Sequence, residues 1–557
     1  MRPLLRACLG AALAAAVPAQ EATLGTIGPL AEVVEARTAD TDGDGRTELV
    51  VVARDGTVLR YGFDGTALVR RGGLRLRDPG HTLFALVDLA PAAGVELVVA
   101  DPSGTAWLPW PVADAVSDAA PVPLVRRARL SLRTDAPLRS PFVQDLDRDG
   151  RLDLLLPTLQ GVLPFVQEAP ADDGAPRFRA LPLLPVPVTA AIEHDPRRRS
   201  RELAGSLVVP QLETEDLNGD GRADLLTRED QRRSFWLLGD DGGFRAPITL
   251  DLEQFRDSTP KAAVELGSTL VVGDRQLLQR GDVDGDGIPD FVIAHRRKVW
   301  TFLASRDGPQ FTKARTQAVA DDVTAMLLVD LDEDRRHDLL TFQLQLPGVG
   351  ALLLGLVQSI DIDVKCVGYR SEGPGFANLP AWRRTVTLRI PPVLTLLGQQ
   401  EELVQRFLDI VGKTRLGVRG AFAAGASNDL ALVRSDGSAI ERFAGDDAPP
   451  RLDSARGRRI LRELLFEDPA TVFDLERVFA LVSGFVDELS GSLVGDRTPR
   501  ATLPLRDPTQ WRVVDLQAAD FDGAPGDELV VVYAPADGDE TAPRVYDLLR
   551  WPAVAPR

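Results

Sequence analysis

Acidic residues in this chain of 557 residues recur in groups with one fixed spacing, and such a group can bind a metal ion. The pattern is an apolar run, then D-x-D-x-D-G-x-x-D, then a second apolar run. Positions in each loop are numbered 1 to 9 from its first acid. In the last clear copy Arg335 stands where the others have glycine. The five clear copies begin at Asp40, Asp145, Asp216, Asp282 and Asp330.

The chemistry that fits this spacing is calcium coordination, because calcium takes about six to eight hard oxygen ligands. Carboxylates at positions 1, 3 and 5 of a tight loop point the same way, and glycine at position 6 lets the backbone reverse. The carbonyl of position 7 can then face inward, and the acid at position 9 closes the shell. The predicted ligands are Asp40, Asp42, Asp44, Arg46 (carbonyl) and Glu48; Asp145, Asp147, Asp149, Arg151 (carbonyl) and Asp153; Asp216, Asn218, Asp220, Arg222 (carbonyl) and Asp224; Asp282, Asp284, Asp286, Ile288 (carbonyl) and Asp290; and Asp330, Asp332, Asp334, Arg336 (carbonyl) and Asp338.

Three further copies of the pattern are incomplete. One keeps Asp520, Asp522 and Glu528 as candidate ligands but has Ala524 at position 5. The copies at 88–96 and 421–429 keep too few acids, so we expect metal-free hairpins there. A single D-x-D-G segment could be only a polar turn, but recurrence in one register favours metal binding. The sequence therefore predicts about five or six Ca²⁺ ions.

The elements that position these loops are expected to be strands. The acid at position 9 is followed at once by a short apolar run, partly β-branched, which is typical of a buried strand. No helical pattern flanks the loops, which excludes an EF-hand. The clearest runs are residues 49–52, 97–99, 154–156, 291–293 and 529–532.

These loops resemble the FG-GAP/VCBS repeats of bacterial surface proteins and of integrin alpha-chain propellers. The run Gly242-Gly243-Phe244-Arg245-Ala246-Pro247 is similar to the tail of that repeat. The resemblance covers about residues 30–340, 415–445 and 505–550. It implies a β-propeller of four-stranded blades, with each loop joining the first two strands. The predicted fold is mainly β, a seven- or eight-bladed β-propeller with α-helical insertions in the C-terminal half.

The C-terminal half departs from a plain repeat array. Leu403, Phe407 and Val411 share a helical face, and Asp468-Pro469 precedes a second helical stripe from Val472 to Leu489. Residues 360–364 and 385–390 alternate like the strands of a long outer hairpin. The predicted organisation is a signal peptide (1–19), blades with calcium loops (20–345), a hairpin and helix insertion (346–415), a degenerate blade (416–450), a helical insertion (451–500) and a last blade with ring closure (501–557).

The N-terminal segment predicts export. Arg2 and Arg6 precede a short apolar run and a small residue at Ala19, as in a bacterial signal peptide. The run is too short to span a membrane, and no later segment is long enough. Cleavage would leave Cys366 as the single cysteine, so no internal disulfide is expected. We expect a secreted, periplasmic or cell-envelope protein.

Composition and motifs guide the functional prediction. The net charge of −18 argues against a nucleic-acid partner. The four histidines match no catalytic or zinc motif, and no nucleophile elbow or phosphate loop is present. We therefore expect an exported, noncatalytic calcium-binding propeller that binds an extracellular protein or glycan. A carbohydrate-active enzyme (a polysaccharide lyase or hydrolase) and a structural envelope component remain alternatives.

Overall fold

The computed structural model describes residues 23–551 apart from a set of gaps. The predicted signal peptide lies outside the described residues. In the described ranges, no helix is both long and apolar enough to span a membrane. The gaps are 90–93, 112–114, 119, 126–135, 159, 170–175, 187–188, 194–203, 209–211, 229–230, 257–263, 267–269, 273–275, 346–357, 393–415, 423–427, 435, 446–471, 475–497 and 539–541.

The described chain is mainly β, with eight sheets that are each built on four antiparallel strands. The first two sheets each gain a parallel fifth strand, β9 (Val116–Asp118) and β11 (Leu138–Arg139). The strands of the first four sheets are β2 (Val33–Ala39), β3 (Glu48–Ala53), β4 (Thr57–Phe63) and β5 (Leu68–Arg75); β6 (Leu83–Val87), β7 (Glu96–Asp101), β8 (Gly104–Leu108) and β10 (Val122–Val125); β12 (Val143–Gln144), β13 (Asp153–Thr158), β14 (Gly161–Glu168) and β15 (Arg177–Ala180); and β18 (Leu212–Glu215), β19 (Asp224–Arg228), β20 (Arg232–Trp236) and β21 (Ile248–Asp251).

The last four sheets follow the same plan, and the final one combines both ends of the chain. There β1 (Thr23–Leu30) pairs antiparallel with β39. The other strands are β24 (Leu277–Gly281), β25 (Asp290–His295), β26 (Lys298–Phe302) and β27 (Arg315–Ala318); β28 (Ala325–Val329), β29 (Asp338–Gln345), β30 (Ile360–Tyr369), β31 (Trp382–Ile390) and the parallel β35 (Val472–Asp474); β32 (Gly417–Gly420), β33 (Asp429–Val433), β34 (Ala439–Phe443) and β36 (Ala501–Pro504); and β37 (Trp511–Ala519), β38 (Glu528–Pro535) and β39 (Arg544–Leu549).

Smaller elements lie between the sheets along the chain. Two hairpins are formed by β16 (Thr189–Glu193) with β17 (Ala204–Val208), and by β22 (Val264–Leu266) with β23 (Leu270–Val272). Two single 3₁₀ turns complete the described elements, η1 (Pro79–His81) and η2 (Leu252–Phe255).

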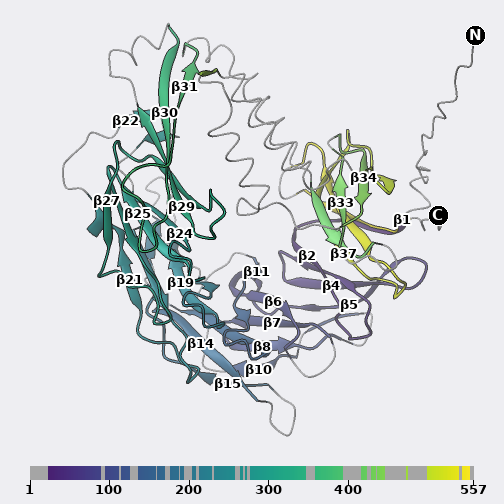
Figure 1. Cartoon of the computed structure of the whole chain (residues 1–557). Helices are drawn as coiled ribbons and strands as arrows, with labels where there is room; N and C mark the ends of the chain where they lie inside the picture. The colour runs from purple at the N-terminus through teal and green to yellow at the C-terminus, as the bar shows by residue number, and fades with distance from the viewer. Residues whose placement is uncertain are drawn as a thin grey trace, which may run out of the picture.

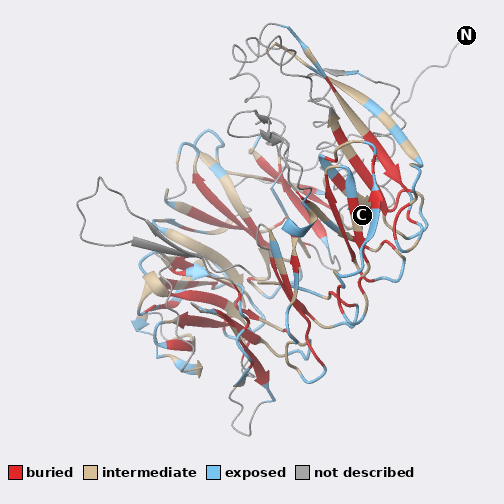
Figure 2. Ribbon diagram, turned by 90° about the vertical axis from the view of Figure 1, so that its left-hand side faces the viewer, coloured by how far each residue is buried: buried red, intermediate tan, exposed pale blue. Residues whose placement is uncertain are grey.

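Central strands such as β3 are covered on both faces by neighbouring sheets, which explains their uninterrupted apolar runs. In β3, Leu49 and Val51 pack with Val530 and Val532 of β38, whereas Val50 and Val52 pack with Phe84 and Val99 of the second sheet. The alternation follows from the two-residue period of a strand. All five apolar runs predicted as buried strands are confirmed. Figure 2 shows the buried residues along the middle strands of the sheets.

The sheets follow one another in chain order along an arc (Figure 1). The C-terminal strands β33, β34 and β37 lie beside β2 and β4, and the packing of Phe422 and Ala431 with Leu516 and Val531 joins the last two sheets. This arrangement of radially packed four-stranded sheets is consistent with a β-propeller.

The predicted helical insertions are not supported. Residues 403–411 and 475–489 lie outside the described part of the chain, and the described residues form only the two 3₁₀ turns. The prediction that Val472 begins a helical face is wrong, because Val472–Asp474 is strand β35 and pairs with β31. Val472 and Phe473 are β-branched and aromatic, types that suit a strand when an edge is available.

The predicted hairpin of residues 360–364 and 385–390 is confirmed. Ile360 pairs with Ile390 and Val364 with Val386, and the two strands are the third and fourth of the β28–β31 sheet. Thr387 Oγ1 donates to Asp363 Oδ1 at 2.7 Å across the pair.

Candidate metal centre

The acidic loops occupy one place in the fold, between the first and second strands of each sheet. The loop that begins at Asp282, for example, joins β24 to β25, and the loop at Asp520 joins β37 to β38. The central strand begins at position 9 in the loops at 40, 145, 216, 282, 330 and 520. A buried, rigid strand therefore anchors the last acid, as the resemblance implies.

The aspartate at position 1 fixes the path of the loop. Asp282 Oδ1 accepts the N–H of Gly285 at 2.7 Å, and its Oδ2 accepts the N–H of Gly287 at 2.9 Å. Both glycines have left-handed φ angles, 84° and 86°, which side chains disfavour. Asp40, Asp216 and Asp330 make the same pair of contacts to positions 4 and 6.

The acid at position 9 is buried and is held by backbone donors. Asp290 is fully buried, with Oδ2 accepting the N–H of Val283 and Oδ1 that of Ala304, both at 2.8 Å. Burial raises the pKa of Asp290 to about 6, against the opposing effect of these hydrogen bonds. Burial likewise raises the pKa of Asp153 and of Asp338 to about 6, and that of Glu528 to about 7. A nearby cation would offset the cost of these buried charges.

The structure brings positions 1, 3 and 9 together in five loops, with one oxygen atom of each acid within 4.8 Å of the others. The groups are Asp40, Asp42 and Glu48; Asp145, Asp147 and Asp153; Asp282, Asp284 and Asp290; Asp330, Asp332 and Asp338; and Asp520, Asp522 and Glu528.

Position 5 lies outside these groups, although the spacing predicted that Asp44, Asp149, Asp286 and Asp334 would converge with the other acids. Its side chain accepts the N–H of position 7, as between Asp286 Oδ1 and Ile288 at 2.8 Å. The loop at 216 forms no all-acid group because position 3 is Asn218, whose Nδ2 donates to Asp220 Oδ2 at 3.0 Å. Inward coordination by the carbonyl of position 7 remains a prediction.

The donor set fits a hard cation. Asp145 Oδ1 and Asp332 Oδ1 are buried and have no hydrogen-bond partner. A buried oxygen without a partner is costly unless an ion or water satisfies it. Several carboxylate oxygens on a loop rich in backbone turns are the ligands that calcium prefers.

Neighbouring loops are hydrogen-bonded to one another. The N–H of position 8 in one loop donates to the carbonyl of position 1 in the preceding loop, as from His337 to Asp282 at 2.7 Å. The same contact joins Thr47 to Asp520 at 2.6 Å and Asp527 to Ala421 at 2.9 Å. His337 is half-buried, because this contact places its ring against Gly281.

Sequence reasoning missed the arginines that approach several of the loops from other strands. Arg60 Nη1 donates to Thr41 Oγ1 at 3.0 Å, and Arg442 and Arg550 contact acids of the loops at 421 and 520. The available signal was a basic residue in or just after the third strand of a sheet. Arg442 lies 13 positions after Asp429, and Arg550 lies 22 positions after Glu528.

Outside the loops, the described residues contain a thiol and a cleft of interest. Cys366 is buried, and burial raises the pKa of its thiol to about 11, which favours the neutral, less reactive thiol. An open cleft of about 420 Å³ beside β26 and β27 is lined by Gln310, Lys313 and Arg315, among others.

Comparison with known proteins identifies residues 282–341 as an FG-GAP-like repeat. The segment contains two of the acidic loops and the strands β25 to β28 between them. No curated protein matches the chain.

Several solved structures are similar at low scores. A lectin of Agrocybe aegerita that recognises non-reducing terminal N-acetylglucosamine is 14% identical, with 64% of this chain and 80% of that chain covered and a TM-score of 0.27. BBS1N in complex with ARL6DN is 10% identical, with 95% and 96% covered and a TM-score of 0.25. A protein from Lactobacillus plantarum is 10% identical, with 74% and 93% covered and a TM-score of 0.20. These scores are too low to support an inference about function.

Proposed function

We propose that this chain, whose residues 282–341 are an FG-GAP-like repeat, is an exported, noncatalytic β-propeller of eight blades that calcium ions hold rigid for recognition of a protein or glycan. The observation that carries the proposal is the repetition of one acidic group in five loops at the same place in the fold. An active site is normally unique, whereas a structural brace recurs.

Calcium would act on these loops by neutralising like charges. Each group holds three acids within a few ångströms, and at least one of them is buried. Without a cation their mutual repulsion opposes folding. With calcium bound, the same carboxylates link the first strand to the central strand of the sheet. This link would take the role of a disulfide, which a chain with Cys366 as its single cysteine after cleavage cannot form internally.

Metal removal tests this part of the proposal. The chain without residues 1–22 would be dialysed against EDTA and then against calcium, with bound metal counted by elemental analysis and unfolding followed by calorimetry. We expect several bound calcium ions and a melting temperature that falls when they are removed. A protein that binds no metal and melts at the same temperature in EDTA would contradict the proposal.

The recognition role needs a surface, and the cleft beside β26 and β27 is one place for it. Lys313 and Arg315 supply positive charge there and Gln310 supplies an amide, a combination that suits the acidic group of a glycan. Binding of calcium-loaded protein to a panel of acidic and neutral glycans tests this role. We expect saturable binding that the double substitution Lys313→Ala and Arg315→Ala reduces at least tenfold. Binding of no glycan, or binding unaffected by the substitutions, would exclude this cleft.

A further inference from the structure

A guanidinium group contacts two of the three grouped acids in the loop at 520–528. Arg550 directly follows β39, the third strand in chain order from β37. Its Nη2 contacts Asp522 Oδ2, and its Nε donates to Glu528 Oε1 at 3.1 Å. Two of the three acids grouped in this loop therefore already have a cation.

In the neighbouring loop at 421–429 an arginine also lies beside an acid, and this arginine is more deeply buried. Its remaining described acid, Asp429, has Oδ2 3.8 Å from Nε of Arg442, and the Arg442 side chain is 2% exposed. Nη1 of Arg442 donates to the Phe422 carbonyl at 2.8 Å. The guanidinium also lies over the ring of Trp551, 5.6 Å from its centroid.

We propose that Arg550 and Arg442 are built-in cations that take the place of calcium in these two loops. This inference rests on the proposed function, because it assigns the calcium ions to the loops at 40, 145, 216, 282 and 330. The consecutive residues Arg550 and Trp551 serve both loops: Arg550 binds the acids of one, and Trp551 covers the arginine of the other.

Arginine and calcium would compete for the same carboxylates, and arginine has the advantage because it is attached to the same chain. A side chain attached to the same sheet has an effective local concentration in the millimolar range or above. Extracellular calcium modules often bind their ion with dissociation constants of about 10⁻⁴–10⁻³ M. The loop at 520 also has Ala524 at position 5, so it offers a divalent ion less negative charge than the complete loops.

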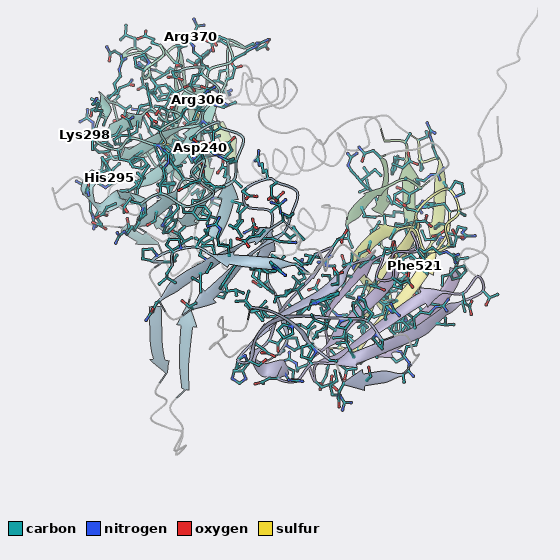
Figure 3. All side chains as sticks on the ribbon, turned by 90° about the horizontal axis from the view of Figure 1, so that it is seen from below. Asp240, His295, Lys298, Arg306, Arg370 and Phe521 are labelled. Atoms are coloured by element: carbon teal, nitrogen blue, oxygen red, sulfur yellow. The ribbon has the colours of Figure 1, made fainter. Side chains whose placement is uncertain are left out.

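Arg370 provides an internal comparison. It follows β30 as Arg550 follows β39, and its Nε lies 3.2 Å from Asp332 Oδ2. However, Asp338 keeps its two backbone donors, Leu331 and Ser371, and Asp332 Oδ1 is buried without a partner. The Arg370 side chain is 56% exposed and lies over the Trp382 ring. It therefore contacts Asp332 and leaves the buried Asp338 available to a metal ion. Arg370 and Phe521, position 2 of the loop at 520, lie on opposite sides of the arc (Figure 3).

The test is a count of calcium ions per chain, by equilibrium dialysis against calcium chloride, for the wild type and four variants. Arg550→Gln should gain one ion because it frees Asp522 and Glu528. The matched control Arg370→Gln should bind the wild-type number. Asp522→Asn should also bind the wild-type number, whereas Asp284→Asn should lose one ion.

The outcomes separate this inference from the proposed function. Loss of an ion in Asp522→Asn, or no gain of an ion in a folded Arg550→Gln, would overturn the arginine assignment. The proposed function would still stand in either case, because the other loops would still bind calcium. Should Arg550→Gln fail to fold, as judged by circular dichroism, Asp522→Asn decides the question because it retains Arg550. Absence of calcium from the wild type and from Arg550→Gln would overturn both.

Discussion

Acids of one loop lie in different surroundings, and their roles differ accordingly. In the loop at 282, Asp290 is buried and bonded to two backbone N–H groups, Asp284 is half-buried, and Asp286 is exposed. Asp284 belongs to the three-acid group, and Asp286 does not. A metal ion bound there would depend on Asp284 more than on Asp286.

Substitution of these two residues tests that ranking. We expect Asp284→Asn to remove one calcium ion per chain and to lower the melting temperature in calcium, because it removes a grouped charge without removing the side-chain volume. Asp286→Asn should keep the ion at lower affinity. Titration calorimetry measures the number of bound ions and their affinity in each variant. Loss of one ion in both variants would show that position 5 moves into the site when calcium binds.

Arg335 is a second residue whose conformation makes a prediction. It occupies position 6 with φ of 70°, where the complete loops have glycine. A left-handed conformation costs a residue with a side chain roughly 1–2 kcal/mol, and the greater freedom of glycine in the unfolded chain offsets about 0.5–1 kcal/mol of this. Arg335→Gly should therefore raise the free energy of unfolding by about 0.5–1 kcal/mol in urea denaturation. Arg336→Gly, at a neighbouring residue outside the left-handed region, should lower it; a rise in both variants would contradict the argument.

At the scale of the elements, the loops are coupled as well as repeated. The carbonyl of Asp282 accepts the N–H of His337, and Ser371 bonds both loops, donating its hydroxyl to the Val283 carbonyl and its N–H to Asp338. A change in the path of one loop therefore alters the acceptor that its neighbour uses. The order of each loop should depend on the metal in the next.

A double-mutant cycle measures this coupling. Asp284→Asn and Asp332→Asn lie in hydrogen-bonded neighbouring loops, and we expect their effects on the free energy of unfolding in calcium to deviate from additivity by at least about 0.5 kcal/mol. The control pair, Asp284→Asn with Asp147→Asn, lies in loops of sheets that are not neighbours. Its effects should add. Equal coupling in both pairs would argue for a global response to calcium.

The sequence predicted those elements whose signal is local. Residues 49–52 and 529–532 read as buried strands because both faces of such strands are apolar, and the acids at positions 1, 3 and 9 read as a group because nine residues fix their spacing. Contacts made across the sheet were not predictable in this way. The bond from Ala304 to Asp290 and the approach of Arg550 to Glu528 depend on strand register, which the spacing within a loop does not encode. The strand at Val472–Asp474 was missed because only the edge of β31 makes it a strand.

For the whole molecule, the join between the two ends of the chain completes the last sheet. β1 pairs with β39, and Ile27 packs with Val530 and Tyr546. Thr26 Oγ1 donates to Asp547 Oδ1 at 2.7 Å, and Asp547 also accepts two bonds from Arg506, at 2.7 and 2.8 Å. This network ties the first strand to the segment before β37.

Removal of β1 tests how much the join contributes to the stability of the whole fold. A chain without residues 1–30 would leave the edge of β39 unpaired and Tyr546 less covered, and exposed edges promote association. We expect a lower melting temperature and concentration-dependent aggregation by light scattering, relative to a chain without residues 1–22 that keeps β1. Thr26→Val should cost only about 1 kcal/mol, because it removes one hydrogen bond and leaves the strand in place. Equal melting temperatures for the two shortened chains would mean that the β37–β39 sheet is stable without its fourth strand, and that packing between neighbouring sheets maintains the arc.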